Sequence, residues 1–247
     1  MSFDLSLFPL LWAAVIVASI LRAFTGFGFA LAAVPIFAHL VPPHTAVVLS
    51  ASLVFVTSLL NFPTLRKSVS LDSAGIAIGV LLLVSIVSAL ATADMDTKKF
   101  QLYAGLALML GCSLLVFRRF LAIKKTRVGD AIAGLLAGLM NGMFAMPGPP
   151  LVIYLLSTEP DPIKCRANII TFMLIAAAFA LFSFAIAGYF SWANVWLFLG
   201  CFPVMVVGDR LGAALFGRYG QARYRQVAIM VLLVIACTTV ASAFYAR

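Results

Sequence analysis

Two stretches interrupt long apolar segments with glycine and proline. The first reads Arg22-Ala-Phe-Thr-Gly-Phe-Gly-Phe29, and the second reads Asn141-Gly-Met-Phe-Ala-Met-Pro-Gly-Pro-Pro150. They lie within apolar runs 5–38 and 131–157, each of which is too long for one ordinary transmembrane helix and short for two. Glycine and proline at this density break a helix. Because broken backbone at membrane depth must be buried in protein or line a wet cavity, we predict two buried hairpins.

The composition supports a membrane location for the whole chain. Of its 247 residues, 64% are hydrophobic and only 10% are charged, whereas a soluble domain carries about 25% charged residues. The formal net charge is +9, but the basic residues lie in short gaps between apolar runs, a pattern that encodes membrane topology. The composition therefore disfavours a nucleic-acid partner. The four cysteines form no CxxC pair and indicate packing rather than metal or redox chemistry.

Six further apolar segments have lengths that fit single helices. Residues 192–208 are short as an apolar run, and we expect that helix to continue past Asp209. The six segments are 45–63, 71–93, 100–117, 167–190, 192–208 and 226–244. The predicted fold is an all-α polytopic membrane protein.

The distribution of Lys and Arg distinguishes two ways of threading this chain. If all eight segments cross once, eight basic residues face each side. If both broken segments return to the side on which they begin, thirteen face the cytoplasm and three face outside, namely Lys98, Lys99 and Arg247. Cytoplasmic loops are enriched in Lys and Arg. The second threading is therefore preferred, with both chain ends outside.

The two halves share one order of elements, a broken segment and then three helices. We predict a first repeat over 1–120 with its hairpin at 5–40, a basic cytoplasmic linker over 121–128, and a second repeat over 129–247 with its hairpin at 129–158. A hairpin plus three crossings is an odd number of passages, so the second repeat enters from the opposite face. The result is an inverted repeat, a common transporter design.

The broken segments have the chemistry of an anion site. Helix N-termini offer free N–H groups and the positive end of the helix dipole, and glycine lets the backbone approach a ligand. One predicted wall consists of Thr25, Gly26, Phe27 and Gly28. The other consists of Asn141, Pro147, Gly148 and Pro149. The alternative interpretation is that these residues only allow close helix packing.

Arg22 lies deep in the first apolar run, where an ionisable side chain is taken as functional by default. Its planar fork matches the oxygens of a sulfonate or carboxylate, although snorkelling to an interface or binding a structural carbonyl is the alternative. We expect Ser50, Asn61 and Thr171 to complete the pocket. Intramembrane Ser and Thr often bond only to backbone carbonyls, so that role remains an alternative for Ser50 and Thr171.

Four other polar residues are weaker candidates. His39 and His44 lie in a proline-bearing loop and are candidates for proton coupling, with an ordinary loop role as the alternative. Asp209 and Arg210 are adjacent, and they are candidates for a gate or for simple local pairing. Two histidines and scattered carboxylates make no metal site, so we expect neither a metal nor a cofactor.

Several of these motifs, in this order, resemble the sulfite exporter family TauE/SafE. The first repeat of the family is similar to Gly26-Phe-Gly-Phe-Ala-Leu-Ala-Ala-Val-Pro35 followed by Pro42-Pro-His-Thr-Ala-Val47. The second repeat is similar to Gly134-Leu-Leu-Ala-Gly-Leu-Met-Asn-Gly-Met-Phe144 and Pro147-Gly-Pro-Pro-Leu151, and Gly208-Asp-Arg-Leu-Gly212 resembles a late family element. The resemblance implies a bacterial inner-membrane permease that moves sulfur-containing or carboxylate anions, often outward, by secondary coupling.

The sequence thus leads to a secondary transporter that exports a small anion such as sulfite, sulfoacetate or a carboxylate by alternating access. An anion channel of the same architecture is the alternative. A membrane enzyme is disfavoured because the chain has no HExxH motif and no paired intramembrane carboxylates. The expected partners are the anion, membrane lipid and a coupling proton, and a second copy of the chain is a further candidate.

Overall fold

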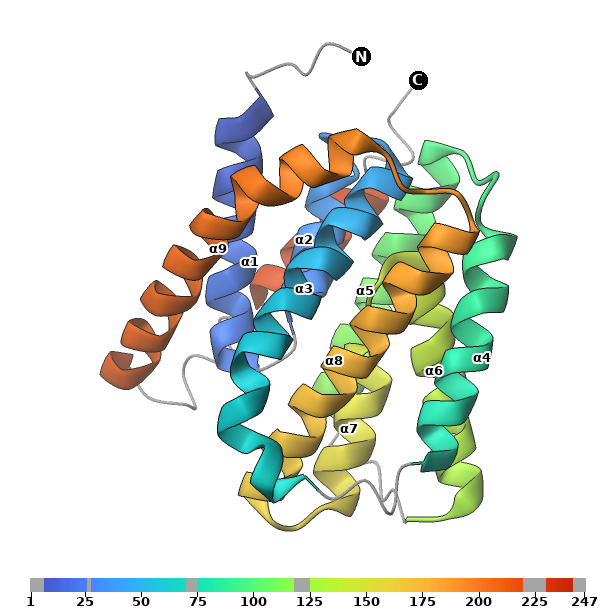
Figure 1. Ribbon diagram of the computed structural model, residues 1–247, viewed down its shortest axis with the longest axis vertical. Helices are drawn as coiled ribbons and strands as arrows, with labels where there is room; N and C mark the ends of the chain where they lie inside the picture. The colour runs from blue at the N-terminus through green and yellow to red at the C-terminus, as the bar shows by residue number, and fades with distance from the viewer. Residues whose placement is uncertain (1–6, 26–27, 70–74, 118–124, 220–229, 242–247) are drawn as a thin grey trace.

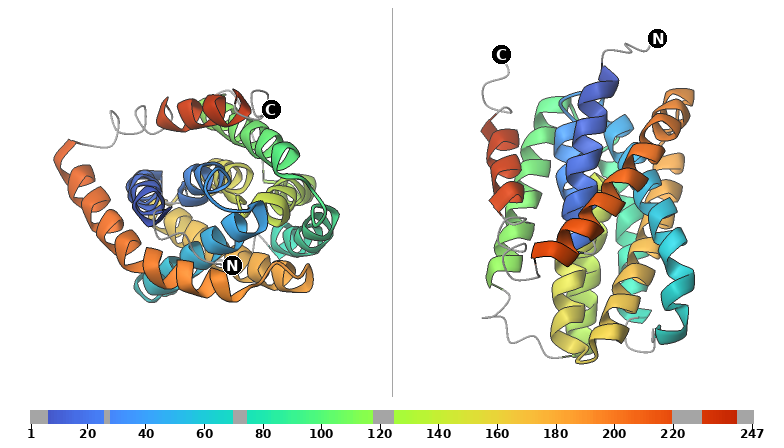
Figure 2. Two further views of the ribbon diagram at one scale, coloured as in Figure 1. Left: turned by 90° about the horizontal axis from the view of Figure 1, so that it is seen from above. Right: turned by 90° about the vertical axis from the view of Figure 1, so that its left-hand side faces the viewer.

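The computed structural model describes residues 7–25, 28–69, 75–117, 125–219 and 230–241 (Figure 1). Within these ranges the chain forms helices and no strand. The predicted all-α class is therefore confirmed for the part of the chain that the structure describes. Most of these helices run along the long axis of the molecule, as the two views in Figure 2 show.

The first half of the chain begins with two helices of unequal length. α1 (Phe8–Thr25) starts at the upper end of the molecule in Figure 1 and stops short of the lower end. α2 (Phe29–Phe37) packs against α1 and runs back toward the upper end. The chain therefore reverses between Thr25 and Phe29, inside the molecule.

Three longer elements complete this half. α3 (Pro43–Leu65) descends to the lower end, where the short 3-10 helix η2 (Arg66–Ser68) follows it. α4 (Gly75–Ala91) ascends, and α5 (Thr97–Phe117) descends again.

The second half starts from the lower end. α6 (Arg127–Phe144) ascends into the interior, and α7 (Gly148–Thr158) packs against it and returns to the lower end. α8 (Pro162–Ile186) then ascends and α9 (Trp192–Tyr219) descends on the outside. The last described helix, Met230–Ala241, lies beside α5, where a Cβ on Gly105 would meet Val240.

Some helix ends in the structure differ from those predicted from the apolar runs, because residues next to the helix cap its ends. The sequence predicts a helix from residue 167, but α8 begins at Pro162 because the Asp161 carboxylate accepts hydrogen bonds from the N–H groups of Ile163 and Lys164, at 2.8 and 3.3 Å. The same helix ends at Ile186, earlier than the predicted 190, and Gly188 with φ of +74° follows it. The expected continuation past Asp209 is confirmed, since α9 extends to Tyr219.

Glycine allows α4 and α6 to pack with their backbones in close contact. Three glycines four residues apart on α6 face α4: Gly134, Gly138 and Gly142. Their backbone neighbours on α4 have the same spacing: Ala77, Leu81 and Ser85. A Cβ on Gly138 would lie 2.8 Å from Val84 Cβ and 2.9 Å from the Leu81 carbonyl oxygen. This is the small-residue packing that membrane helices use where no hydrophobic force draws them together.

α1 and α9 pack in a related way. A Cβ on Gly208 would lie 2.7 Å from Ser19 Cβ, and a Cβ on Gly200 would lie 2.6 Å from the Phe8 ring. Trp12 Nε1 also donates a hydrogen bond to the Gly200 carbonyl oxygen at 3.1 Å. Helix α9 is thereby held along much of the length of α1.

The outer surface of the helices is apolar, as lipid requires. Leu83, Val87, Trp192 and Trp196 are among the most exposed large side chains of the described residues. Three described helices are long and apolar enough to cross a bilayer: Pro43–Pro63, Ile163–Ile186 and Trp192–Leu215. By contrast, the short arm α2 is almost wholly buried, and α7 is buried from Gly148 to Leu155.

Candidate anion-binding site

The N-terminal ends of the two short helices meet at one glycine of α5. A Cβ added to Gly111 would lie 2.8 Å from Pro149 Cγ of α7 and 3.9 Å from Leu31 Cδ2 of α2. Leu31 and Pro149 both belong to the first turn of their helices. The positive ends of two helix dipoles therefore point into the same part of the interior.

The turn between α6 and α7 holds Pro147, Gly148 and Pro149 in place. Ala145 has φ of +55°, and its N–H donates to the Asn141 carbonyl oxygen at 2.8 Å while that of Met146 donates to the Met140 carbonyl oxygen at 3.0 Å. Pro147 occupies the N-cap of α7 without a side-chain cap. Since Pro149 and Pro150 carry no N–H, this end offers fewer backbone donors than an ordinary first turn.

The corresponding residues of the first hairpin are only partly described. Gly28 is buried and forms the N-cap of α2. Thr25 is the last residue of α1, and Gly26 and Phe27 lie outside the described residues.

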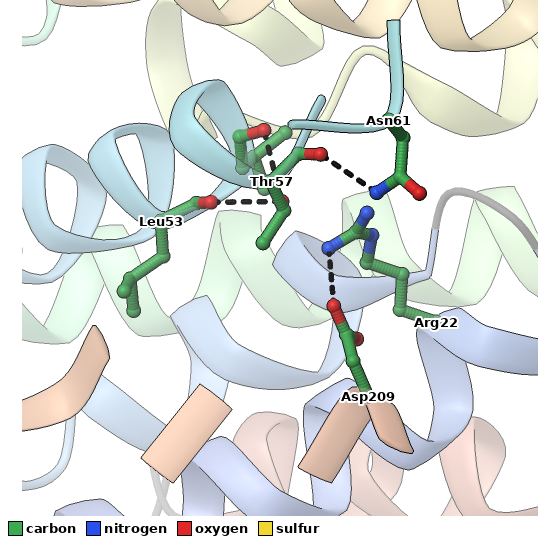
Figure 3. A network of polar contacts seen from close by, with 6 residues as sticks. Arg22, Leu53, Thr57, Asn61 and Asp209 are labelled. Atoms are coloured by element: carbon green, nitrogen blue, oxygen red, sulfur yellow. Dashed lines mark hydrogen bonds and ion pairs between the residues drawn. The ribbon is translucent and has the colours of Figure 1, made fainter. Parts of the chain in front are cut away.

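Arg22 forms an ion pair that connects the two halves of the chain. Its Nη1 lies 3.1 Å from Oδ2 of Asp209, although 187 positions separate the two residues in the sequence. The side chain of Arg22 is 13% exposed and that of Asp209 is 27% exposed. In Figure 3 the guanidinium lies between Asp209 of α9 and Asn61 of α3. The structure thus brings together three residues that the sequence proposed for binding or gating.

Asp209 does not pair with its neighbour in the sequence. Arg210 is exposed on α9, so local pairing of the two adjacent residues is not what the structure shows. Asn61 Nδ2 donates to the Thr57 carbonyl oxygen at 2.7 Å, which fixes the amide beside the guanidinium (Figure 3).

Asn141 forms a second polar link between the halves. Its Nδ2 donates to Ser85 Oγ of α4 and to the Ala176 carbonyl oxygen of α8, both at 3.0 Å. The amide side chain is buried, and its Oδ1 has no hydrogen-bond partner among the described residues. An unsatisfied buried acceptor is uncommon in a folded protein, which makes this oxygen a candidate contact for a donor on a ligand or a water.

The two links occupy matching places in the two hairpins. Arg22 precedes the last residue of α1 by three positions, and Asn141 precedes the last residue of α6 by three positions. Arg22 reaches α9, and Asn141 reaches α4. One link is an ion pair and the other is a pair of neutral hydrogen-bonding groups.

The remaining pocket candidates contribute unequally. Ser50 is fully buried on α3, and its Oγ has no hydrogen-bond partner within the described ranges. Thr171 is buried on α8, which packs against α3, but its Oγ1 donates to the Ala167 carbonyl oxygen of its own helix at 2.8 Å. The hydroxyl of Thr171 thus has the backbone role that many intramembrane threonines have.

His39 and His44 lie apart from Arg22, near the upper ends of α2 and α3. Gln101 Nε2 lies 3.2 Å from His39 Nδ1, and partial burial lowers the pKa of His39 below its ordinary value. The His44 ring centroid lies 6.2 Å from that of Tyr189. Burial raises the pKa of Tyr189, whose hydroxyl donates to the Ala89 carbonyl oxygen at 3.0 Å.

A small cavity lies beside His44. It has a volume of about 30 Å³ and includes Pro43, Thr92, Tyr189 and Met143 in its lining, so it has room for about two water molecules. Met143 belongs to the last turn of α6, two residues after Asn141. The cavity therefore leads from the upper end of the molecule toward the tip of the second hairpin.

Sequence reasoning missed several residues that lie in or near the candidate site. Ser85 was not singled out, because a serine in an apolar helix carries no signal of its partner on another helix. Asp130 is 6% exposed in the first turn of α6, and its position at the start of the second apolar run could have identified it as a buried acid. Gly111 could be recognised only from the contact with Pro149.

The described residues contain no group of three His, Cys, Asp or Glu side chains that could hold a metal ion. The four cysteines are not joined in disulfides: Cys112, Cys165, Cys201 and Cys237.

Apolar helices that surround an arginine paired with an aspartate from another helix are typical of a polytopic membrane protein. Residues 11–239 match the family model for the sulfite exporter TauE/SafE, and the chain belongs to this family, as the resemblance of its motifs predicted.

A curated relative agrees with this assignment. The chain is 31% identical over 136 residues to a protein of Cupriavidus necator described as a probable sulfite/organosulfonate exporter TauE. The match covers 52% of this chain and 53% of the relative, so the chain spans about half the length of that protein. No solved structure matches the chain significantly.

Proposed function

We propose that this protein is a secondary transporter that exports a small organosulfur anion, such as sulfite or sulfoacetate, or a small carboxylate across the bacterial inner membrane. The observation that carries the proposal is the burial of Arg22 at the tip of the first hairpin, beside Asn61 and Asp209. In the structure Asp209 compensates this cation, and in the proposal the substrate anion takes over that role. The printed name of the Cupriavidus relative supports an organosulfur substrate.

The geometry of Arg22 suits a small oxyanion. A guanidinium presents five N–H donors in a rigid fork, and the ion pair with Asp209 joins only Nη1 to one carboxylate oxygen. A sulfonate, sulfite or carboxylate can accept two parallel N–H bonds from the same fork. In this proposal the N-terminal ends of α2 and α7, including Gly28, Pro147, Gly148 and Pro149, add positive potential.

The alternating-access mechanism rests on an inverted repeat of residues 1–120 and 129–247, joined by the linker 121–128. The helix contacts support this repeat, because several contacts made by one half have a counterpart in the other. The packing of α1 on α9 corresponds to that of α6 on α4, and the packing of α3 on α9 corresponds to that of α8 on α4. Inverted repeats of this kind rock around a central site.

The orientation in the membrane is proposed from charge. The lower end of the molecule carries the ends of α3 and η2 and the starts of α6 and α8 (Figure 1). The basic residues in these segments are Arg66, Lys67, Arg127, Lys164 and Arg166. The upper end has Lys98 and Lys99 in the first turn of α5. The excess of Lys and Arg assigns the lower end to the cytoplasm.

Ligand-dependent thermal stabilisation of the purified protein tests the proposal. Sulfite, sulfoacetate, taurine, sulfate and small carboxylates are compared, and we expect one organosulfur or carboxylate anion to raise the melting temperature by mass action. Arg22→Ala should abolish that stabilisation. Arg210→Ala, which removes an exposed arginine of α9, is the matched control and should keep it.

Arg22→Ala alone leaves the Asp209 carboxylate buried without its cation, which can impair folding. The double variant Arg22→Ala/Asp209→Ala removes both charges and is therefore the better-folded test. If the double variant is stabilised by the anion as strongly as the unmodified protein is, Arg22 does not bind the substrate.

A further inference from the structure

Asp209 provides an acidic oxygen at the place where an oxyanion would contact Arg22. Its Oδ2 lies 3.1 Å from Nη1, which is within the range of a charge-assisted contact to a ligand carboxylate or sulfonate. Substrate and Asp209 therefore compete for one guanidinium. The inference that follows rests on the proposed function and concerns what happens to Asp209 when the anion arrives.

The charge balance of this region limits the bound state to one anion. In the described residues of α1, α2, α3 and α9, Arg22 and Asp209 are charged side chains that are partly buried, whereas Arg210 is exposed. With substrate on Arg22 and Asp209 still ionised, two negative charges would share one positive charge in a largely apolar interior. Such an uncompensated charge is disfavoured there. Protonation of Asp209 removes it.

We propose that the anion binds Arg22 together with a proton on Asp209, so that one anion and one proton are bound at the same site. The proton adds to a carboxylate oxygen of Asp209, its contact with Arg22 is lost, and the oxygens of the anion accept hydrogen bonds from the guanidinium. For an anion of charge −1, the net charge of the site, counting the anion once it is bound, is zero both before and after binding. The empty site is closed by the ion pair, and the occupied site contains the guanidinium, the anion and a neutral carboxylic acid.

The other ionisable groups near this pair do not offer an alternative proton site. The electrostatic partner of Asp209 is Arg22, and that of Arg22 is Asp209. Helix α2 has no ionisable residue, and His44 of α3 lies near its first residue, while Asn61 lies near its last. Arg66, Lys67 and Arg210 are exposed basic side chains.

The second hairpin provides an internal comparison. Asn141, at the place equivalent to Arg22, bonds to Ser85 and the Ala176 carbonyl oxygen, and neither side chain titrates near neutral pH. Proton-linked binding is thereby confined to the link between α1 and α9. Asp209 retains 27% of its side-chain surface exposed, about twice the 13% of Arg22.

The test is calorimetric titration of the purified full chain with sulfoacetate between about pH 6 and pH 8. Both acidic groups of sulfoacetate remain ionised there, so any pH dependence belongs to the protein. With this dianion the occupied site would carry a net charge of −2 if Asp209 stays ionised and −1 if it is protonated, so proton uptake is favoured here as well. We expect the dissociation constant to fall as the pH falls, approaching about tenfold per pH unit for one coupled proton. Titration in two buffers with different ionisation enthalpies measures the proton directly and should give about one proton taken up per anion.

Asp209→Asn keeps the size of the side chain and mimics its protonated form. This variant should bind sulfoacetate on the order of tenfold more tightly at about pH 8 and lose the pH dependence. Asp130→Asn is the matched control, since it neutralises another buried aspartate on a helix that does not contact Arg22, and it should keep the pH dependence of the unmodified protein.

The results separate this inference from the proposed function. Tight binding without pH dependence or proton uptake would overturn the coupling and leave the transporter proposal intact. Pronounced pH dependence that persists in Asp209→Asn would place the proton elsewhere and also overturn it. Sulfoacetate binding that survives in the Arg22→Ala/Asp209→Ala variant would instead remove Arg22 from the site, and would overturn this inference together with the binding role proposed for Arg22.

Discussion

At the scale of single residues, the structure pairs polar side chains across the two halves rather than along the chain. Arg22 contacts Asp209, and Asn141 contacts Ser85. The type of residue could be predicted from sequence, because an arginine and an asparagine deep in apolar runs must find polar partners. The partners could not be predicted from sequence. Arg210 is adjacent to Asp209 in the chain, and only the folded structure shows that the Asp209 carboxylate contacts the guanidinium of Arg22 rather than that of Arg210.

Asn141 gives a prediction at this scale. Asn141→Ala should lower the free energy of unfolding by about 1–3 kcal/mol, because the Ser85 hydroxyl and the Ala176 carbonyl oxygen lose a buried donor. Thermal or denaturant unfolding in detergent measures the change. Asn61→Ala is the control, because Asn61 is exposed and bonds to the Thr57 carbonyl oxygen of its own helix, and its effect should be smaller. Equal losses in the two variants would contradict the inter-helix role of Asn141.

At the scale of helices, the breaks were predicted from sequence and the packing partners were not. Glycine and proline located both reversals, which the structure places between Thr25 and Phe29 and between Phe144 and Gly148. The sequence also contained the glycines of α6 at four-residue spacing. Spacing alone does not tell which helix they face, since any neighbour with a small or exposed backbone could fit, and the structure identifies α4.

The α4–α6 contact gives a prediction for these elements. Gly138→Ala should destabilise the protein by about 1–3 kcal/mol, because the new Cβ would lie 2.8 Å from Val84 Cβ and 2.9 Å from the Leu81 carbonyl oxygen. Gly79→Ala in α4 has no atom within 4 Å of the added Cβ, and it should be neutral or slightly stabilising through helix propensity. Unfolding of both variants in the same detergent tests the contrast, which fails if Gly138→Ala is as stable as Gly79→Ala.

At the scale of the whole molecule, the all-α fold follows from composition and apolar runs, while the lengths of the hairpin arms do not. The first hairpin was expected over 5–40 and the second over 129–158, and the helices occupy Phe8–Phe37 and Arg127–Thr158. In the first hairpin α1 has 18 residues and α2 has 9, and in the second hairpin α6 has 18 residues and α7 has 11. That inequality depends on where the chain turns against its neighbours, which hydropathy does not encode.

The orientation of the chain in the membrane can be tested by cysteine labelling. In a cysteine-free background, Lys67→Cys and Lys164→Cys should react with an impermeant maleimide only from the cytoplasmic side, and Lys98→Cys only from the outside. The reason is that η2 and the start of α8 lie at one end of the molecule and the start of α5 at the other (Figure 1). Labelling of Lys67→Cys and Lys164→Cys from opposite sides would rule out the hairpin topology.

The unlike chemistry of the two equivalent links has a consequence for the finished machine. An ion pair loosens when the acidity or salt of its surroundings changes, whereas a neutral amide–hydroxyl contact hardly responds. A protein with one link of each kind would respond to pH at the link between α1 and α9 and hardly respond at the link between α6 and α4. The ease with which it opens would then depend on the compartment that communicates with Asp209.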